Sequence, residues 1–241
     1  MKSSVFIRPA SARPFVVMNM AMTADGKIAS ANRAVSTFGS RRDLEHLYEL
    51  RATADAVMAG ARTLDLNPVL LGPGGERFKR MRLKNGLSEY GLRVVVSGSG
   101  SIRPDAAIFQ KRFSPIILLT TGRASRATRE RLGCMVDEVV VCGRREIDFG
   151  FALRWLRERW NVQRLLCEGG GELNAALFRA GLVDELHLTL CPLIFGGRRA
   201  PTIAEGTGWA RLADAAQLTL TRVVRVRDEL FLTYRRVGAE R

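Results

Sequence analysis

Short apolar runs that favour β-strands alternate with helical segments along most of the chain, and no other feature of the sequence limits the fold as much. The expected strands are Phe15–Met22, Asp55–Gly60, Leu92–Val96, Ile116–Thr120, Glu138–Val141 and Arg164–Cys167. The expected helices are Arg41–Ala52, Ser125–Leu132, Asp148–Trp160 and Glu172–Ala180. Strands separated by helices predict a mainly parallel sheet that helices cover on both faces.

The last third of the chain changes to strand signals alone. Glu185–Leu190 is followed by Gln217–Val226 and Glu229–Arg236, and a tight turn at Arg227-Asp228 joins the last two. Such a hairpin predicts an antiparallel edge. We therefore predict an α/β fold: one three-layer α/β/α domain over residues 14–241, with a mixed, mainly parallel sheet, an antiparallel C-terminal hairpin and an arm at residues 1–13. Residues 65–91 are rich in Gly, Pro and charge, which indicates a loop or a mobile excursion.

Composition excludes several classes of protein. Hydrophobic residues make up 46% of the chain, yet the longest apolar runs fall far short of the roughly 20 residues that a membrane span needs. The N-terminus has no apolar stretch typical of a signal peptide, so we expect a cytoplasmic protein with no membrane contact. Four Cys without a C-x-x-C pair and only two His predict reduced core cysteines and no metal site.

The net charge of +14 comes mainly from Arg, because 33 of the 38 basic side chains are Arg. These arginines are scattered along the chain, with few aromatic residues near them, so nucleic-acid binding is not favoured. Arginine forks suit anionic cofactors and phosphorylated small molecules. A basic nucleic-acid-binding protein on the same fold stays open as an alternative.

The segment Glu168-Gly169-Gly170-Gly171-Glu172-Leu173-Asn174 runs from a buried strand directly into a helix. Without Cβ atoms, the backbone can approach a phosphate group while the start of the helix presents free N–H groups to it. The spacing matches neither G-x-G-x-x-G nor G-x-x-x-x-G-K-[ST]. A phosphate site and a tight turn without a ligand both remain open from this segment alone.

Three further segments place polar residues at strand ends. Met22–Ile28 carries Asp25 and Lys27 just after a buried strand, where open α/β sheets bind ligands. The run DAVMAGART ends a strand in glycine before a short polar turn or helix start. The run CPLIFGGRR leaves a strand through a double glycine into Arg198-Arg199, which could clamp a phosphate. Each segment alone is also compatible with a purely structural turn.

Taken together and in this order, these segments resemble one known family. The matching stretches are NMAMTADGKIA (Asn19–Ala29), LRATADAVMAGART (Leu50–Thr63), LLCEGGGELNAALFRAGLVDEL (Leu165–Leu186) and CPLIFGGRRAPT (Cys191–Thr202). They resemble the pyrimidine reductases of riboflavin biosynthesis, within the dihydrofolate reductase-like superfamily. The resemblance covers roughly residues 14–236.

The resemblance implies an NADPH-dependent reductase that delivers hydride to C1′ of a ribosylaminopyrimidine 5′-phosphate and yields a ribitylamino product. It assigns the cofactor site to Gly60, Thr63, Ser97, Ser99, Arg103, Thr120, Thr121, Gly169, Gly170, Gly171 and Leu173. Within this set, the three glycines would receive the pyrophosphate and the two threonines at 120 and 121 would lie near the adenosine half. The Ser97–Arg103 turn would hold the 2′-phosphate.

On the substrate side, the resemblance implies that Lys27 and Glu168 are catalytic and flank the sugar C1′. The remaining substrate residues are Asn19, Asp25, Ser36, Ser40, Arg51 and Asn67. Asn19 and Asp25 would lie near the base, and the others near the sugar or its phosphate. Hydride addition needs an iminium-like carbon, so an acid–base group and a negative charge suit this step.

The sequence departs from the family pattern at the pocket. Asp65-Leu66-Asn67-Pro68 stands where the family usually has an Asp-Asp-Pro turn, and Val96-Ser97-Gly98 lacks the Asp of the usual Val-Asp-Ser. Reduction of the diaminopyrimidine, of its deaminated form, or of a dihydropterin or dihydrofolate-like molecule therefore stays open.

Two expectations concern partners. This sequence lacks the H-x-E…P-C-x-x-C set of the zinc deaminase domain found in bifunctional riboflavin enzymes, so another protein would carry out the deamination. We also expect a homodimer, because exposed strand edges are usually paired or covered.

Overall fold

The secondary structure follows the predicted alternation over residues 12–34 and 36–238, which are the part of the chain that the computed structural model describes. The strands are β1 (Phe15–Thr23), β2 (Ala56–Gly60), β3 (Leu92–Val96), β4 (Ile116–Thr120), β5 (Glu138–Val141), β6 (Arg164–Cys167), β7 (Glu185–Cys191), β8 (Leu218–Val226) and β9 (Glu229–Arg236). The helices are α1 (Arg41–Arg51), α2 (Ala61–Leu66), α3 (Glu76–Lys84), α4 (Ala107–Gln110), α5 (Arg126–Gly133), α6 (Phe149–Trp160), α7 (Gly171–Arg179) and the 3-10 helix η1 (Leu212–Asp214). The predicted arm falls largely outside the described residues.

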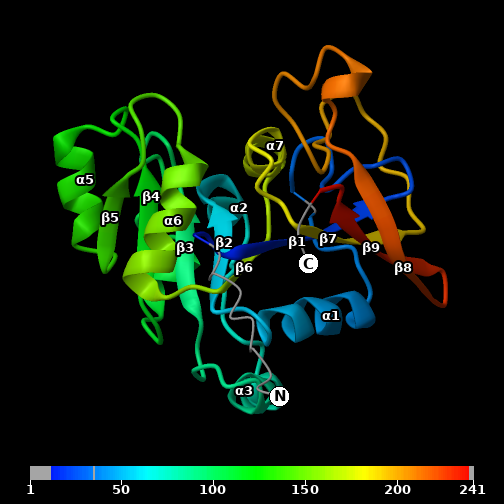
Figure 1. Cartoon of the computed structure of the whole chain (residues 1–241), viewed down its shortest axis with the longest axis horizontal. Helices are drawn as coiled ribbons and strands as arrows, with labels where there is room; N and C mark the ends of the chain where they lie inside the picture. The colour runs from blue at the N-terminus through cyan, green and yellow to red at the C-terminus, as the bar shows by residue number, and fades with distance from the viewer. Residues whose placement is uncertain (1–11, 35, 239–241) are drawn as a thin grey trace, which may run out of the picture.

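The strands form one sheet in the order β5-β4-β3-β2-β6-β1-β7-β9-β8 (Figure 1). The pairs from β5 to β7 are parallel, whereas β9 pairs antiparallel with both β7 and β8. This arrangement confirms the predicted mixed, mainly parallel sheet with an antiparallel C-terminal hairpin.

Successive side chains of the central strands enter two separate apolar layers, because side chains alternate between the faces of a strand. Val94 and Leu119 pack in one layer with residues of α6 and α7. Val95 and Leu118 pack in the other layer with residues of α2, α4 and α5. The sheet is therefore covered on both faces, as the continuous apolar runs predicted.

The prediction of a loop over residues 65–91 was wrong, because this segment contains α3. The Arg82 side chain is only 1% exposed and donates hydrogen bonds to the carbonyl oxygens of Arg51 (2.6 Å), Ala54 (2.7 Å) and Ser88 (2.8 Å). Phe78 packs its ring 5.2 Å from that of Tyr48. These long-range contacts hold a helix that has too few apolar residues to show a helical period. The short helix α4 was also missed, and α2 lies where either a polar turn or a helix start was expected.

The described part of the chain contains neither a membrane-spanning helix nor a metal-binding cluster. None of its helices is long and apolar enough to cross a membrane. No group of three or more His, Cys, Asp and Glu side chains there is arranged to bind a metal ion. All four cysteines are free, and only Cys134 is exposed.

The two histidines of the chain join α1 to β7. Nε2 of His46 lies 3.2 Å from Nδ1 of His187, whose Nε2 lies 2.8 Å from Oε1 of Glu185. Burial and the neighbouring imidazole lower the pKa of His46 to about 4. The hydrogen bond with His187 lowers the pKa of Glu185 to about 2. The contact between the two imidazoles therefore opposes protonation of His46.

We predict that acid weakens the fold partly through His46. Between pH 6.5 and pH 4 the unfolded chain binds a proton at this residue that the folded chain does not, so stability falls as the pH falls through this window. The expected loss is on the order of 2 kcal/mol. Urea unfolding at pH 7.5, 5.5 and 4.5 measures it, and His46→Gln should lose less stability than wild type over the same range. Equal losses in both proteins would contradict the prediction.

Candidate active site

A cleft of about 1170 Å³ opens at the carboxyl ends of the parallel strands. The turns that follow β2, β3, β4, β5 and β6 contribute to its lining, together with α1 and the start of α7. Because β1 to β6 are parallel, their carboxyl ends meet at one edge of the sheet, which is where open α/β sheets bind ligands.

The glycine-rich turn between β6 and α7 forms one wall of this cleft. A Cβ atom on Gly169 would lie 2.5 Å from Sδ of Met20, and one on Gly170 would lie 3.2 Å from Oγ1 of Thr63. Both glycines have positive φ, at 82° and 103°. The backbone N–H of Gly60 donates to the carbonyl of Gly169 at 3.0 Å, which packs the two strand-end turns together.

The first-turn N–H groups of α7 have no partner within the helix, and Gly170, Gly171 and Leu173 line the cleft beside them. A backbone without side chains at the start of a helix suits a phosphate group. These residues therefore fit a nucleotide cofactor.

Glu168 and Arg51 form a buried ion pair in the cleft wall. Nε and Nη2 of Arg51 lie 2.5 and 2.6 Å from the two carboxylate oxygens of Glu168, and Nη1 donates to the carbonyl of Gly72 at 2.6 Å. Burial opposes the charge on Arg51, but the Glu168 carboxylate outweighs it and raises the pKa of Arg51. This arrangement fixes a negative charge at the end of β6 and ties α1 to the glycine-rich turn.

Lys27 and Asp25 lie outside the cleft lining. Asp25 accepts hydrogen bonds from Thr23 Oγ1 (2.6 Å) and from the backbone N–H of Gly196 (2.7 Å). The hydroxyl of Thr23 is the main reason that the pKa of Asp25 is lowered. Nζ of Lys27 donates to the carbonyl of Ala200 at 3.3 Å. Asp25 and Lys27, in the turn after β1, therefore bind the loop that follows β7. Among the described residues, Lys27 makes no hydrogen bond or ion pair with Glu168.

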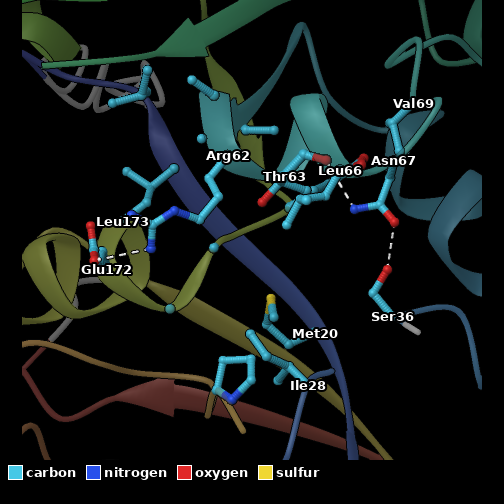
Figure 2. Close-up of a pocket in the computed structure, with 18 of the residues that line it drawn as sticks. Met20, Ile28, Ser36, Arg62, Thr63, Leu66, Asn67, Val69, Glu172 and Leu173 are labelled. Carbon is cyan, nitrogen blue, oxygen red and sulfur yellow. Dashed lines mark hydrogen bonds and ion pairs between the residues drawn. The ribbon is translucent and has the colours of Figure 1, made fainter. Parts of the chain in front are cut away.

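Among the predicted substrate residues, Asn19, Ser36 and Asn67 do face the cleft. The Ser36 hydroxyl donates to Oδ1 of Asn67 at 2.5 Å, and Nδ2 of Asn67 donates to the carbonyl of Thr63 at 2.9 Å (Figure 2). The Asn19 side chain is 9% exposed, and its Oδ1 has no hydrogen-bond partner among the described residues. Asn19 therefore lines the cleft, while its Oδ1 atom is buried without a partner among the described residues.

Ser40 lines the cleft but its hydroxyl is engaged. Ser40 caps α1 by accepting from the N–H groups of Arg42 and Asp43, and Oγ donates to Oε2 of Glu229 at 2.5 Å. The cap fixes the start of α1, at whose other end Arg51 lies.

The residues predicted for the adenosine half and the 2′-phosphate are partly brought together. Ser97, Ser99 and Thr121 line the cleft, whereas Thr120 and Arg103 do not. Of the glycines predicted for the pyrophosphate, Gly169 does not line it. The Thr121 hydroxyl donates to the carbonyl of Gly98 at 2.7 Å, and the Thr120 hydroxyl does so at 3.3 Å. Arg103 pairs with Asp105 at 2.6 Å on the surface.

Sequence reasoning missed several charged residues of the cleft. Arg33, Arg62, Arg123, Arg145, Glu172 and Glu205 all line it. Arg62 lies within the DAVMAGART run and Glu172 directly after the three glycines, so charge beside the glycines is the sequence signal for both. The others come from loops without a local pattern.

Comparisons with known proteins agree with this geometry. The family model of the RibD C-terminal domain matches residues 14–232. The 2,5-diamino-6-ribosylamino-4(3H)-pyrimidinone 5′-phosphate reductase of Methanothermobacter thermautotrophicus is 34% identical over 92% of this chain and 98% of its own length. The enzyme of the same name from Archaeoglobus fulgidus is 30% identical over 83% of this chain and 90% of its own.

Solved structures show the same fold. Acinetobacter baumannii RibD superposes with a TM-score of 0.74 at 18% identity. The superposition covers 94% of this chain and 59% of the RibD chain. The riboflavin biosynthesis reductase of Saccharomyces cerevisiae gives a TM-score of 0.70 at 15% identity, covering 95% of this chain and 93% of that one. These likenesses confirm the predicted dihydrofolate reductase-like fold, and the family match confirms the predicted resemblance. The chain belongs to the RibD C-terminal domain family.

Proposed function

We propose that the protein is the NADPH-dependent reductase of riboflavin biosynthesis that converts 2,5-diamino-6-ribosylamino-4(3H)-pyrimidinone 5′-phosphate into its ribitylamino form. The observation that carries the proposal is the cleft itself, where the glycine-rich turn and the Arg51–Glu168 pair share one cavity. The choice of the diaminopyrimidine rests on the relatives of that name, which match this chain over nearly their whole length. In this proposal the single sheet acts as one reductase domain.

The cofactor half of the cleft would be built from backbone and small side chains. Gly60, Thr63, Leu173 and the glycines of the turn would hold the pyrophosphate and the nicotinamide end, with Ser97, Ser99, Thr120 and Thr121 near the adenosine. A reduced nicotinamide supplies the hydride when bound. Arg103 would reach a 2′-phosphate only by leaving Asp105.

The substrate half would contain the fixed carboxylate. Glu168, held by Arg51, offers negative charge to an iminium-like C1′, and its rigid ion pair keeps the carboxylate from turning away. Asn19, which lines the cleft, would lie against the base. Ser36, Ser40 and Asn67 would line the sugar and phosphate. Asp25 would hold the loop beside the base, and Lys27 would have to leave Ala200 to deliver a proton.

The direct test is oxidation of NADPH by the purified protein. We expect turnover with the diaminopyrimidine ribosyl phosphate, slower turnover with its deaminated form, and none with dihydrofolate. Absorbance at the reduced-nicotinamide band measures each rate, with NADH as the comparison cofactor. Reduction of dihydrofolate alone, or of none of the three, would contradict the proposal.

The catalytic assignment predicts that Glu168→Gln and Lys27→Ala each lower kcat at least about tenfold. Glu168→Gln removes the charge that stabilises C1′, and Lys27→Ala removes the proposed proton donor. Glu158→Gln and Lys84→Ala, at exposed positions outside the cleft, are the matched controls and should keep wild-type rates. Wild-type kcat in Glu168→Gln or in Lys27→Ala would remove that residue from the mechanism.

We also propose a homodimer formed through the edge of the sheet. β8 is one of the two edge strands of the sheet (Figure 1) and exposes Leu220 at 48% and Val223 at 52%. Apolar side chains on an open strand edge favour pairing with a second chain. Light scattering should give a dimer for wild type and a monomer for Leu220→Glu. Leu83→Glu, at an equally exposed site on α3, should stay dimeric, and a monomeric wild type would refute the proposal.

A further inference from the structure

Two ion pairs link separate segments that line the cleft beside the glycine-rich turn. Nη1 of Arg62, on α2, lies 3.4 Å from Oε1 of Glu172 in the first turn of α7. Figure 2 shows Arg62 extending from α2 toward Glu172. Nη2 of Arg33, in the loop after β1, lies 3.2 Å from Oε1 of Glu205, in the loop after β7. All four residues line the cleft.

Glu205 lies directly against the turn. Its backbone N–H donates to the carbonyl of Gly171 at 2.9 Å, and a Cβ atom on Gly171 would lie 2.6 Å from Cγ of Glu205. Glu172 directly follows Gly171 in the chain. Two carboxylates therefore flank the segment whose backbone suits an anion.

Both ion pairs are weakly held. The Arg62 and Glu172 side chains are 62% and 69% exposed, and those of Arg33 and Glu205 are 31% and 24% exposed. Each pair shows a single contact rather than the two-point geometry of Arg51 with Glu168. An exposed single-contact pair such as Arg62 with Glu172 contributes little to stability. The Arg33–Glu205 pair is half-buried but also has a single contact, so both arginines can change partners.

A phosphate group competes well for such arginines, because charge-assisted hydrogen bonds from a guanidinium to phosphate oxygens are strong and often two-pointed. The same phosphate is repelled by a carboxylate next to it. Arg62 and Glu172 would thus act on a bound phosphate in opposite senses, and so would Arg33 and Glu205.

We propose that Glu172 and Glu205 hold Arg62 and Arg33 in the free protein, and that the pyrophosphate of the cofactor takes both arginines from these carboxylates when it binds. This exchange rests on the proposed function, because it requires NADPH at the glycine-rich turn. It makes cofactor affinity the result of a competition: the carboxylates weaken binding and the arginines strengthen it.

The test is the Kd of NADPH, measured by calorimetry for single variants at fixed ionic strength. Glu172→Gln and Glu205→Gln should tighten binding by about threefold, whereas Arg62→Gln and Arg33→Gln should weaken it by about tenfold. In the Arg62→Gln background, Glu172→Gln should tighten binding less than it does alone. The weakening in the arginine variants should shrink as salt rises.

Arg126 and Glu130 on α5 form an ion pair outside the cleft and provide the matched control. Arg126→Gln and Glu130→Gln should leave the Kd unchanged, and thermal melting checks that every variant is folded. If both members of a cleft pair shift the Kd in the same direction, or neither shifts it, the exchange is refuted while NADPH binding stands. If wild type does not bind NADPH, the proposed function and the exchange fail together.

Discussion

The buried ion pair of Arg51 with Glu168 is the contact on which the cleft depends. The pair joins the end of α1 to β6, the strand that leads into the glycine-rich turn. Nη1 of Arg51 also donates a hydrogen bond to the carbonyl of Gly72. The carbonyl of Arg51 in turn receives Arg82 from α3. A buried charge that loses its partner is strongly destabilising, so each of these segments is held in place by the need to keep the pair intact.

The strands were predictable because a run of consecutive apolar residues is enough to identify a buried strand. Strands covered on both faces appear in the sequence as continuous apolar runs, and the bounds of Leu92–Val96, Ile116–Thr120 and Arg164–Cys167 agree with the structure to the residue. The helix α3 was not predictable, because its stability comes from Arg82, whose hydrogen bonds reach residues about 30 positions earlier. Propensity and periodicity carry no information about such contacts.

The candidate site divides in the same way. The glycine-rich turn is a backbone feature, so its sequence is enough to locate it at the cleft. The partners of the charged side chains depend on which loops lie close together in the fold, and the sequence pattern does not predict this. Glu168 takes Arg51 as its partner, the Ser40 hydroxyl takes Glu229, and Lys27 takes a carbonyl outside the cleft lining. Residue types therefore indicated the chemistry of the cleft better than they indicated its pairings.

One departure from the family pattern has a physical explanation in these pairings. Asn67 stands where the resemblance led us to expect an Asp, and its carboxamide accepts from Ser36 while donating to the carbonyl of Thr63. A carboxylate has no donor and would face that carbonyl with like partial charge. The amide satisfies both neighbours at once and locks the turn after α2. Asn67 therefore leaves this position of the cleft wall uncharged and makes a pair of hydrogen bonds that a carboxylate could not make.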